Sequence, residues 1–454
     1  MLDPMSRSHA AGAATSVTSA WPLRAALSAL LLAFAAFLAW QYLMPAEFES
    51  SFLLDHAGLA QFRDAFGVAA SPLPFATYRA GFRIILGVLW AAYFVALFAG
   101  YAGARLPRRS SLVAAVVGLA LMTALAWPPS FSCDVYGYVA YGRLQALYGM
   151  NPYLTTQRAL RDLDDPTGRF LVWNIGSPYG PLWTALSAAV VWVSRGAPLV
   201  AQIVFMKLVG GAAVVATALL GRRVAERLAP GRGELTLVAI GMNPLFVIEG
   251  AGNAHNDFVM MALVVAAIDA TLDGRTRRAL LLAGLGGAVK FLPLALVPWI
   301  LLRELKSRPA PWGARLRLVV GGGLTAALPL LVSFLPYWSG RGTLRGLEAR
   351  WTSSQTTAAN AKVALAVEAA TLLVTYLAAT AWAARGAPAR LLSAWMALAG
   401  VIFFVAAGIW LPWYVSWVWI IALLRWDRRS AVVSHLAFCL AVVLTLRYSV
   451  PSGG

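Results

Sequence analysis

The side chains best suited to chemistry stand in four short polar segments between long apolar runs. In the first segment, Asp134 closely follows an apolar run and stands among aromatic and small residues. A carboxylate in such surroundings costs free energy unless it is ion-paired or used in function. Two interpretations stay open: a functional carboxylate able to move a proton, or a structural partner for Arg143. The nearby Tyr136 and Tyr138 could equally belong to an interfacial aromatic belt.

Two further segments place polar side chains between apolar runs. Four hydrogen-bonding side chains lie within five residues, namely Asn253, His255, Asn256 and Asp257. Asn253 or Asp257 would cap the following helix well, but capping alone does not explain this density at membrane depth, which favours function. Lys290 is centred in another apolar stretch and must either snorkel to the interface or pair with an anion.

The remaining segment, Trp173–Trp183, combines two prolines and two glycines with Ser177 and Tyr179. Such residues form a shaped turn at the bilayer surface, although a plain entry turn into the next helix has the same composition. By itself this segment is weak evidence for a site.

The composition indicates an all-α polytopic membrane protein. Of the 454 residues, 60% are hydrophobic and only 12% are charged, and the mean hydropathy is +0.70. Soluble domains carry about a quarter charged residues, so this chain cannot cover itself with a wetted surface. The net charge of +18 does not indicate nucleic-acid binding, because the arginines fall in short loops between apolar runs. Cys133 and Cys439 are too few for a disulfide framework or a zinc site.

The apolar runs predict about 13 transmembrane helices, with the N-terminus inside and the C-terminus outside. Residues 1–21 are then a cytoplasmic tail before a retained first helix, since no signal-peptide cleavage site follows that helix. This count is supported because, with these spans, all the arginine clusters lie on the same side of the membrane. These clusters are Arg105/Arg108/Arg109, Arg222/Arg223/Arg227, Arg275/Arg278, Arg315/Arg317, Arg385/Arg390 and Arg428/Arg429. Residues 181–194 are too few to span and are expected outside, as a re-entrant or interfacial segment.

Residues 279–302 form an apolar stretch with basic clusters at both ends, and both ends should therefore face the cytoplasm. We predict two short helices that meet at Lys290–Pro293, with the turn towards the far side. Four segments then face outward together, and the unusual polar residues collect in them. These segments are Pro128–Gly180, Gly250–Asp257, the turn at Lys290 and Tyr337–Lys362.

Together these motifs resemble those of the GT-C class of membrane glycosyltransferases, and most closely the polyprenol-phosphate-mannose-dependent α-1,6-mannosyltransferases. The resemblance covers residues 128–300 well, and the order and spacing of the motifs are more specific than any single one. It rests on Asp134–Tyr138 with Asn151-Pro152-Tyr153, on Ser177–Leu182, on Asn253–Asp257 and on Lys290 before Pro293. It implies one transmembrane glycosyltransferase domain over residues 1–454, with a GT-C-type fold and residues 128–180 as the external catalytic loop.

The resemblance also implies roles. In this class an aspartate in an early external loop is the general base, which places that role on Asp134, and an inverting transfer needs such a carboxylate near the acceptor hydroxyl. The leaving lipid phosphate needs cations, which are expected from Lys290, His255, Arg341 and Arg345. Residues expected to contact the sugar or acceptor are Tyr136, Tyr138, Asn151, Tyr153, Tyr179, Asn253, Asn256 and Asp257. In better-known members the aspartate follows the first span, whereas three apolar runs precede Asp134, so roles are carried over by motif and not helix by helix.

The expected protein is thus a cell-membrane hexosyltransferase that moves a sugar, mannose by the resemblance, from a polyprenyl-phosphate donor to an extracytoplasmic glycan or glycolipid. No cofactor or metal is expected, since Asp162, Asp164 and Asp165 are interpreted as solvated loop residues. The hydrogen-bonding groups fit any hexose, and the acceptor, linkage and oligomeric state stay open. The alternatives are a transporter or lipid-sugar flippase with titrating groups at His255, Asp257 and Glu368, or a non-catalytic scaffold.

Overall fold

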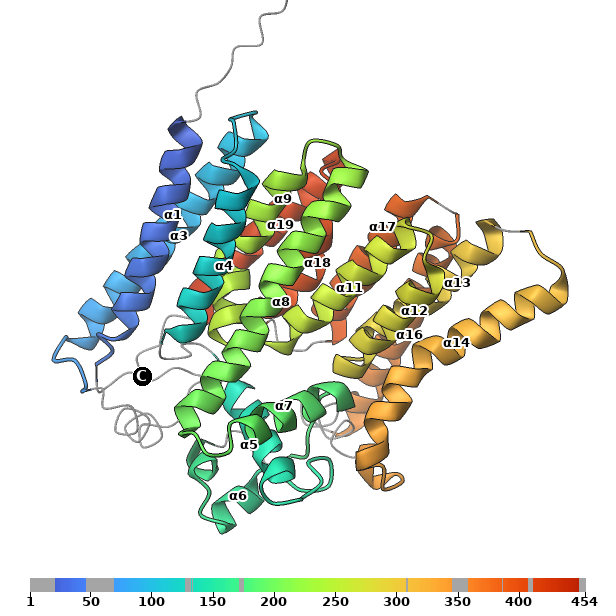
Figure 1. The fold of residues 1–454 in the computed structure, drawn as a ribbon, viewed down its shortest axis with the longest axis horizontal. Helices are drawn as coiled ribbons and strands as arrows, with labels where there is room; N and C mark the ends of the chain where they lie inside the picture. Colours follow the sequence, from blue (N-terminus) through green and yellow to red (C-terminus); the bar gives the residue numbers. More distant parts are fainter. Residues whose placement is uncertain are drawn as a thin grey trace, which may run out of the picture.

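The structure, a computed structural model, describes residues 21–45, 69–126, 132, 134–170, 175–307, 309–344, 358–385, 387–406 and 411–448. This part of the chain consists of helices and turns, and its β-structure is limited to two isolated bridges, Pro45–Ser71 and Ser339–Arg341. Figure 1 shows a bundle of long helices with a layer of shorter helices, α5 to α7, across one end. The all-α class predicted from composition is therefore confirmed.

Three apolar helices form the N-terminal side of the bundle. α1 (Trp21–Gln41) packs along α3 (Phe75–Tyr101), and α4 (Arg109–Leu125) lies between this pair and the centre (Figure 1). These helices are apolar around most of their circumference, as expected where one side meets other helices and the other meets lipid. Leu32 of α1, for example, is 71% exposed, whereas Phe34 is fully buried.

The central helix is α8 (Leu199–Leu228), which contacts α4, α9 (Gly233–Gly241) and α11 (Asn256–Leu272). Gly210 allows a close approach here, because a Cβ at this position would lie 2.1 Å from the carbonyl oxygen of Gly250. Small residues commonly permit such backbone contact between membrane helices. The approach brings the polar segment that follows Gly250 against the middle of the bundle.

The chain between α9 and α11 is irregular. Asn243 accepts hydrogen bonds from the N–H groups of Leu245 and Phe246 and so begins the short helix α10 (Pro244–Phe246). One π-helical turn, η2 (Val247–Gly252), follows, and the two halves of this apolar stretch are bent by 50° relative to each other. Single π-helical turns occur frequently at functional sites.

Seven helices follow α11 in the described part of the chain: α12 (Thr276–Val289), α13 (Leu296–Ser307), α14 (Trp312–Phe334), α16 (Ala358–Ala383), α17 (Pro388–Val401), α18 (Ser416–Ala422) and α19 (Arg428–Tyr448). α12 ends at Val289, and the 3₁₀ turn η3 (Leu292–Ala295) leads into α13. Pro293 cannot donate a backbone hydrogen bond, which favours a break at this place. The prediction of two short helices meeting at Lys290–Pro293 is therefore confirmed.

The end layer comprises α5 (Asp134–Ala146), α6 (Arg158–Asp162), the 3₁₀ turn η1 (Pro166–Phe170) and α7 (Pro181–Val193). α7 packs against α5 and has only 13 residues. The predicted segment 181–194 is thus a short helix that ends at Val193, and its length is below the roughly 20 residues that a membrane span needs.

Seven of the described helices are long and apolar enough to cross a membrane, or eight if the bent pair Gly233–Gly241 and Pro244–Gly252 is one span. The predicted count of about 13 is not confirmed, because several of the apolar runs fold as helices shorter than the roughly 20 residues that a bilayer requires. α11, α12, α13 and α18, for instance, have 17, 14, 12 and 7 residues. The chain is nevertheless a polytopic helical membrane protein.

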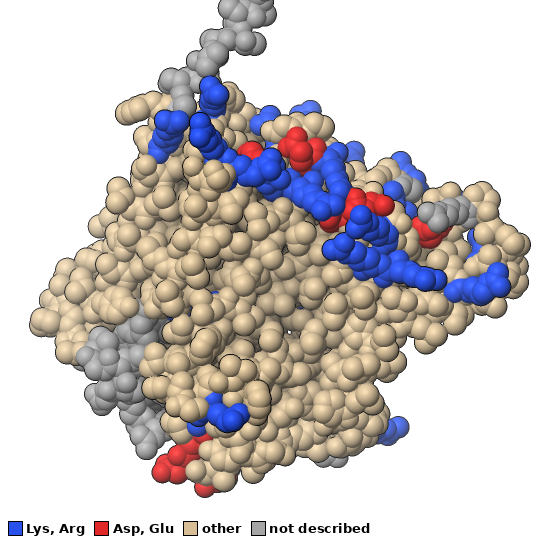
Figure 2. Space-filling model, in the orientation of Figure 1, with Lys and Arg blue, Asp and Glu red and all other residues tan. Residues whose placement is uncertain are grey.

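Lysine and arginine side chains gather along the end of the bundle opposite the α5–α7 layer (Figure 2), and we call this end the basic face. Ion pairs join its separate loops. Glu234 pairs with Arg109 at 3.0 Å and with Arg222 at 2.8 Å, and Arg227 pairs with Asp273 at 2.6 Å. These arginine clusters therefore lie on one side, as predicted, and the positive-inside rule makes the basic face the expected cytoplasmic face.

Candidate active site

Asp134 is the first residue of α5 and is 8% exposed. Its backbone N–H donates to Oγ of Ser132 at 3.1 Å, which holds the start of the helix in place. Its Oδ2 accepts a hydrogen bond from the hydroxyl of Tyr138 at 3.3 Å and lies 3.5 Å from Nδ1 of His255. Two of the polar segments identified in the sequence therefore meet at this carboxylate.

His255 is fully buried and lies between two carboxylates. Its Nδ1 faces Asp134, and its Nε2 is 3.2 Å from Oε2 of Glu249. The preceding Ala254 has a φ of +58°, a left-handed conformation that costs free energy in a non-glycine residue and marks a constrained turn. The indole of Trp413 stacks on the imidazole with 3.7 Å between ring centroids. Two adjacent carboxylates favour the protonated, positively charged form of the ring.

Lys290 pairs with an anion of its own chain. Its Nζ donates to Oδ1 of Asp257 at 2.7 Å, and it lies over the rings of Tyr414 and Trp417, at 4.7 and 5.0 Å from their centroids. The indole N–H of Trp417 donates to the same Asp257 oxygen at 2.6 Å. Of the two interpretations of Lys290, pairing is therefore correct, and the partner comes from the segment that also carries His255.

Several polar atoms here are buried without a hydrogen-bond partner in the described part of the chain. They include both amide atoms of Asn256 and Oδ2 of Asp257, and each of these side chains is 1% exposed. The ring nitrogens of His255 approach carboxylates, but neither is aligned for a hydrogen bond. An unpaired buried polar group costs about 1–3 kcal/mol and calls for a functional or solvent explanation. We call the whole group the polar cluster: Asp134, Glu249, Asn253, His255, Asn256, Asp257 and Lys290.

Tyr138 contacts the polar cluster through Asp134 and joins it to other tyrosines of the α5–α7 layer. The ring of Tyr138 meets that of Tyr179 edge to face at 4.9 Å, and the hydroxyl of Tyr153 donates to the carbonyl of Tyr179 at 2.7 Å. Asn151 donates from its amide to the carbonyl of Tyr337 at 2.9 Å and accepts from the N–H of Tyr153 at 3.0 Å. Asn151 and Tyr153 thus hold loops together, and their predicted contacts with sugar stay a prediction.

The structural alternative for Asp134, an ion pair with Arg143, is not found. The guanidinium of Arg143 instead binds both carboxylate oxygens of Asp165, at 2.8 to 3.0 Å. Tyr148 and Thr167 also donate to Asp165, which is 2% exposed. Burial alone would raise the pKa of this carboxyl, but its hydrogen bonds, from Arg143 above all, lower the pKa.

The prediction that Asp165 is a solvated loop residue is therefore wrong. The prediction failed because of a tertiary contact: α5 places the guanidinium of Arg143 against Asp165, which lies 22 residues later in the chain. Asp162 and Asp164 are exposed, as predicted. Among the described residues, no group of three His, Cys, Asp or Glu side chains could hold a metal ion.

Two predicted site residues lie apart from these contacts. Tyr136 is buried within α5 and is 2% exposed. Arg341 is exposed in the loop after α14, where its backbone bridges to Ser339. Its side chain has no ion pair or hydrogen bond to the polar cluster within the described ranges. Arg345 lies outside the described residues.

Lys207 was missed by the sequence analysis. This residue of α8 is 2% exposed, and its ammonium group donates to the carbonyl of Ala126. With Thr123 and Asn253 it lines a small cavity of about 10 Å³, roughly the space of one water molecule. Asn253 in turn donates to Glu249 at 2.9 Å, which links Lys207 to the polar cluster. A lysine inside an apolar run is a functional signal in itself and could have been found.

The aromatic segment Pro412–Trp417 was also missed as part of the site. It comprises the 3₁₀ turn η7 (Pro412–Val415) and the first two residues of α18, and it supplies Trp413 to His255 and Tyr414 with Trp417 to Lys290. Glu249, which the sequence analysis gave no role, also belongs to the site through its contact with His255. Only the fold shows that these residues surround two cations, because they lie far apart along the chain.

Comparisons with known proteins identify the family of the chain. A family model described as alpha-(1->6)-mannopyranosyltransferase, N-terminal domain, matches residues 25–305. Alpha-(1->6)-mannopyranosyltransferase A of Mycobacterium tuberculosis is 30% identical over 347 residues, which cover 67% of this chain and 64% of that relative. The chain therefore spans somewhat less than two thirds of the relative's length. No solved structure matches the chain significantly. Because the family match covers more than half of the 454 residues, the chain belongs to the alpha-(1->6)-mannopyranosyltransferase family.

Proposed function

We propose that this protein transfers mannose from a polyprenyl-phosphate donor to a hydroxyl of an extracytoplasmic glycan or glycolipid, with the α-(1→6) linkage named for its relative. The observation that carries the proposal is the meeting of Asp134 with His255 in a buried cluster that retains unpaired polar atoms. Family membership favours a transferase over a transporter or flippase. The polar cluster adjoins the α5–α7 layer, and this layer lies at the end of the bundle opposite the basic face. This position supports an extracytoplasmic site.

In the proposed step Asp134 is the general base. The acceptor hydroxyl oxygen attacks C1 of the mannosyl group, the bond from C1 to the phosphate oxygen breaks, and the hydroxyl proton passes to the Asp134 carboxylate. The configuration at C1 is inverted in this direct displacement. Tyr138 and His255 both contact Oδ2 of this carboxylate, which positions it before substrate binds.

The leaving polyprenyl phosphate develops negative charge that buried cations would stabilise. His255 and Lys290 lie in the polar cluster, and Lys207 lies beside it. Lys290 is 20% exposed and bound to Asp257, so a phosphate oxygen would have to share this ammonium with the carboxylate. Asn256, whose amide has no partner in the described part of the chain, is well suited to hydrogen-bond sugar hydroxyls.

The test is a transfer assay with the purified full-length protein. Its substrates are radiolabelled polyprenyl-phosphate mannose, polyprenyl-phosphate glucose, polyprenyl-phosphate arabinose or a nucleotide-linked mannose, with total membrane glycolipid extract as acceptor. We expect product from polyprenyl-phosphate mannose alone, and linkage analysis should show an α-(1→6) bond. Transfer from the nucleotide-linked sugar would contradict the proposal, and so would the absence of transfer from every lipid donor.

A further inference from the structure

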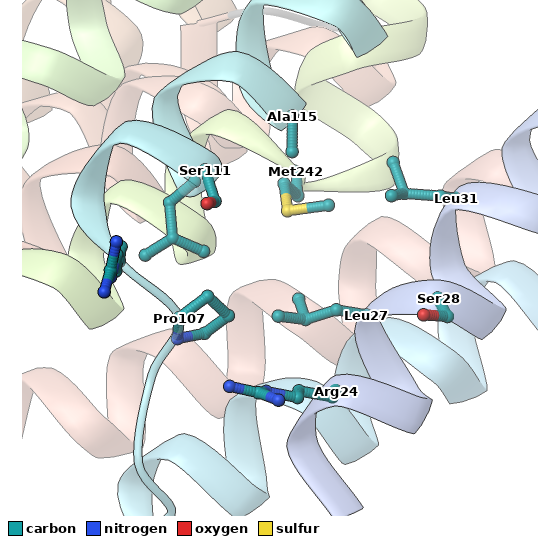
Figure 3. A pocket seen from close by; sticks show the side chains of 10 residues that line it. Arg24, Leu27, Ser28, Leu31, Pro107, Ser111, Ala115 and Met242 are labelled. Atoms are coloured by element: carbon teal, nitrogen blue, oxygen red, sulfur yellow. The ribbon is translucent and has the colours of Figure 1, made fainter. Parts of the chain in front are cut away.

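A groove lies between α1 and α4 at the basic face, remote in the fold from the α5–α7 layer (Figure 3). Its volume is about 440 Å³, within the range of small-molecule sites. Leu27 and Leu31 line it from α1, and Ser111 and Ala115 line it from α4. Figure 3 shows Leu27 pointing towards Pro107, with Met242 between the two helices. α1 packs mainly on α3, which leaves this side of α1 separated from α4.

The groove is polar at one end and apolar along the rest. Arg24 and Arg108 line it together with the hydroxyl-bearing Ser28 and Ser111. Neither arginine has an acidic partner in the part of the chain that the structure describes, whereas the adjacent Arg109 is paired with Glu234 at 3.0 Å. Two guanidinium groups and two hydroxyls form a donor set that suits a phosphate group.

The apolar part extends in the direction of the membrane interior. Arg24 and Leu31 are seven residues apart on α1, so the groove runs for about 10 Å along this helix. α1 is one of the candidate spans, and its outward side chain Leu32 is 71% exposed, as a lipid-facing residue would be. A topology anchor needs only basic residues at the interface. The lining of this groove, with two arginines at one end and leucines and an alanine along the rest, suits a ligand with a charged head and an apolar tail.

We infer that this groove binds one anionic glycerophospholipid from the leaflet at the basic face. The phosphate lies between Arg24 and Arg108, and the upper part of an acyl chain lies against Leu27, Leu31 and Ala115. Phosphate chemistry alone would also admit a free anion, but the length and apolar lining of the groove favour the lipid. The site is distinct from the polar cluster and does not depend on the proposed transfer reaction.

The experiment measures lipid binding to the purified full-length protein by native mass spectrometry and by thermal stabilisation. The probes are dioleoylphosphatidylglycerol, dioleoylphosphatidylcholine and inorganic phosphate. The variant Arg24→Gln/Arg108→Gln removes the charged end, and Ala115→Phe fills the apolar part without changing charge. The matched control is Arg315→Gln/Arg317→Gln, which removes the same charge from exposed positions on α14 outside the groove.

We expect phosphatidylglycerol to bind and stabilise the wild-type protein more than phosphatidylcholine does, with no stabilisation by inorganic phosphate. Arg24→Gln/Arg108→Gln should weaken phosphatidylglycerol binding about 30-fold, since a basic residue near a membrane surface contributes about 1 kcal/mol and 1.4 kcal/mol is a factor of ten. Ala115→Phe should also weaken it, and the α14 control should bind as the wild type does. Equal binding by the two double variants would overturn the inference, because it would show a general effect of surface charge. Equal stabilisation by inorganic phosphate would overturn it in favour of a simple anion site.

Discussion

The two ends of α5 carry two buried carboxylate regions that differ in how their polar atoms are satisfied. At the C-terminal end, Arg143 holds Asp165, and Tyr148 and Thr167 complete the carboxylate's hydrogen bonds. At the N-terminal end, Asp134 begins the helix beside His255, and the neighbouring Asn256 keeps both amide atoms unpaired within the described residues. The two regions are about 14 Å apart along one short helix.

These two regions show that burial of a carboxylate does not by itself indicate function. Asp165 is more buried than Asp134, at 2% against 8% exposed, yet its surroundings are those of a structural ion pair. The region around Asp134 contains His255 between two carboxylates and unpaired donors and acceptors, which a substrate with several hydroxyls and a phosphate would satisfy. Removing each aspartate should therefore affect different properties.

The largest effect on stability is expected at the structural end. Asp165→Ala leaves the guanidinium of Arg143 buried without its partner, and breaking such a pair costs about 3–5 kcal/mol. The variant should unfold at lower temperature or fail to purify, and activity should fall in proportion to folded protein. Asp162→Ala, at the exposed aspartate that ends α6, is the control and should match the wild type. A stable Asp165→Ala protein with a specific loss of turnover would reverse the roles of the two regions.

A smaller effect, on donor binding, is expected at Lys290. A hydrogen bond to a charged group contributes about 1.5–3 kcal/mol, so Lys290→Ala should weaken donor binding about 10- to 100-fold in a protein that still inserts and purifies. Because the same change leaves Asp257 unpaired, the double variant Lys290→Ala/Asp257→Asn is the matched control. If Lys290 binds the phosphate, the double variant binds donor as weakly as the single one.

Recovery of donor binding in the double variant would mean that Lys290 serves only to neutralise Asp257. A Lys290→Ala protein with wild-type transfer would likewise move the phosphate role elsewhere. Arg341 and Arg345 are then the alternatives predicted from sequence, and Lys207 is the one that the structure adds. Lys207→Met, which keeps the length of the side chain, would identify it by a loss of donor binding.

The topology prediction concerns only the side of the membrane on which each position lies. In a protein with Cys133 and Cys439 replaced by serine, single cysteines at the exposed Asp162 and at Thr352 should react with an impermeant maleimide added to intact cells. Cysteines at Arg222, Arg275 and Arg428 should react only after permeabilisation, because these positions belong to the arginine clusters expected in the cytoplasm. Thr352 lies outside the described residues, so its labelling rests on the sequence alone. External labelling at position 222 would place the polar cluster on the wrong side for the proposed acceptor.

Local sequence patterns were sufficient for much of the site. A lysine in an apolar stretch between two basic clusters predicted the break between α12 and α13, since both ends had to face the same side. The density of polar residues at Asn253–Asp257 pointed to a site, and the structure places Asp134 and Lys290 against that segment. Each of these signals is contained in a few neighbouring residues.

The remaining features depend on contacts between distant segments. Nothing near Arg143 in the sequence shows that its partner is Asp165, and nothing near Trp413 shows that it stacks on His255. The predicted count of spans is not confirmed, for a related reason. Hydropathy detects that a run is apolar, but packing inside the bundle decides whether its helix is long enough to cross the membrane, and α12 stops at 14 residues.

The most direct test of the account compares turnover and donor binding in Asp134→Asn. This substitution keeps the size of the side chain but removes its basic oxygen, and general-base contributions are on the order of 10²- to 10⁴-fold. We predict that transfer from polyprenyl-phosphate mannose falls by that factor while donor binding and thermal stability stay at wild-type values, with Asp162→Asn as the control for transfer. A folded Asp134→Asn protein that transfers mannose at the wild-type rate would contradict the mechanism.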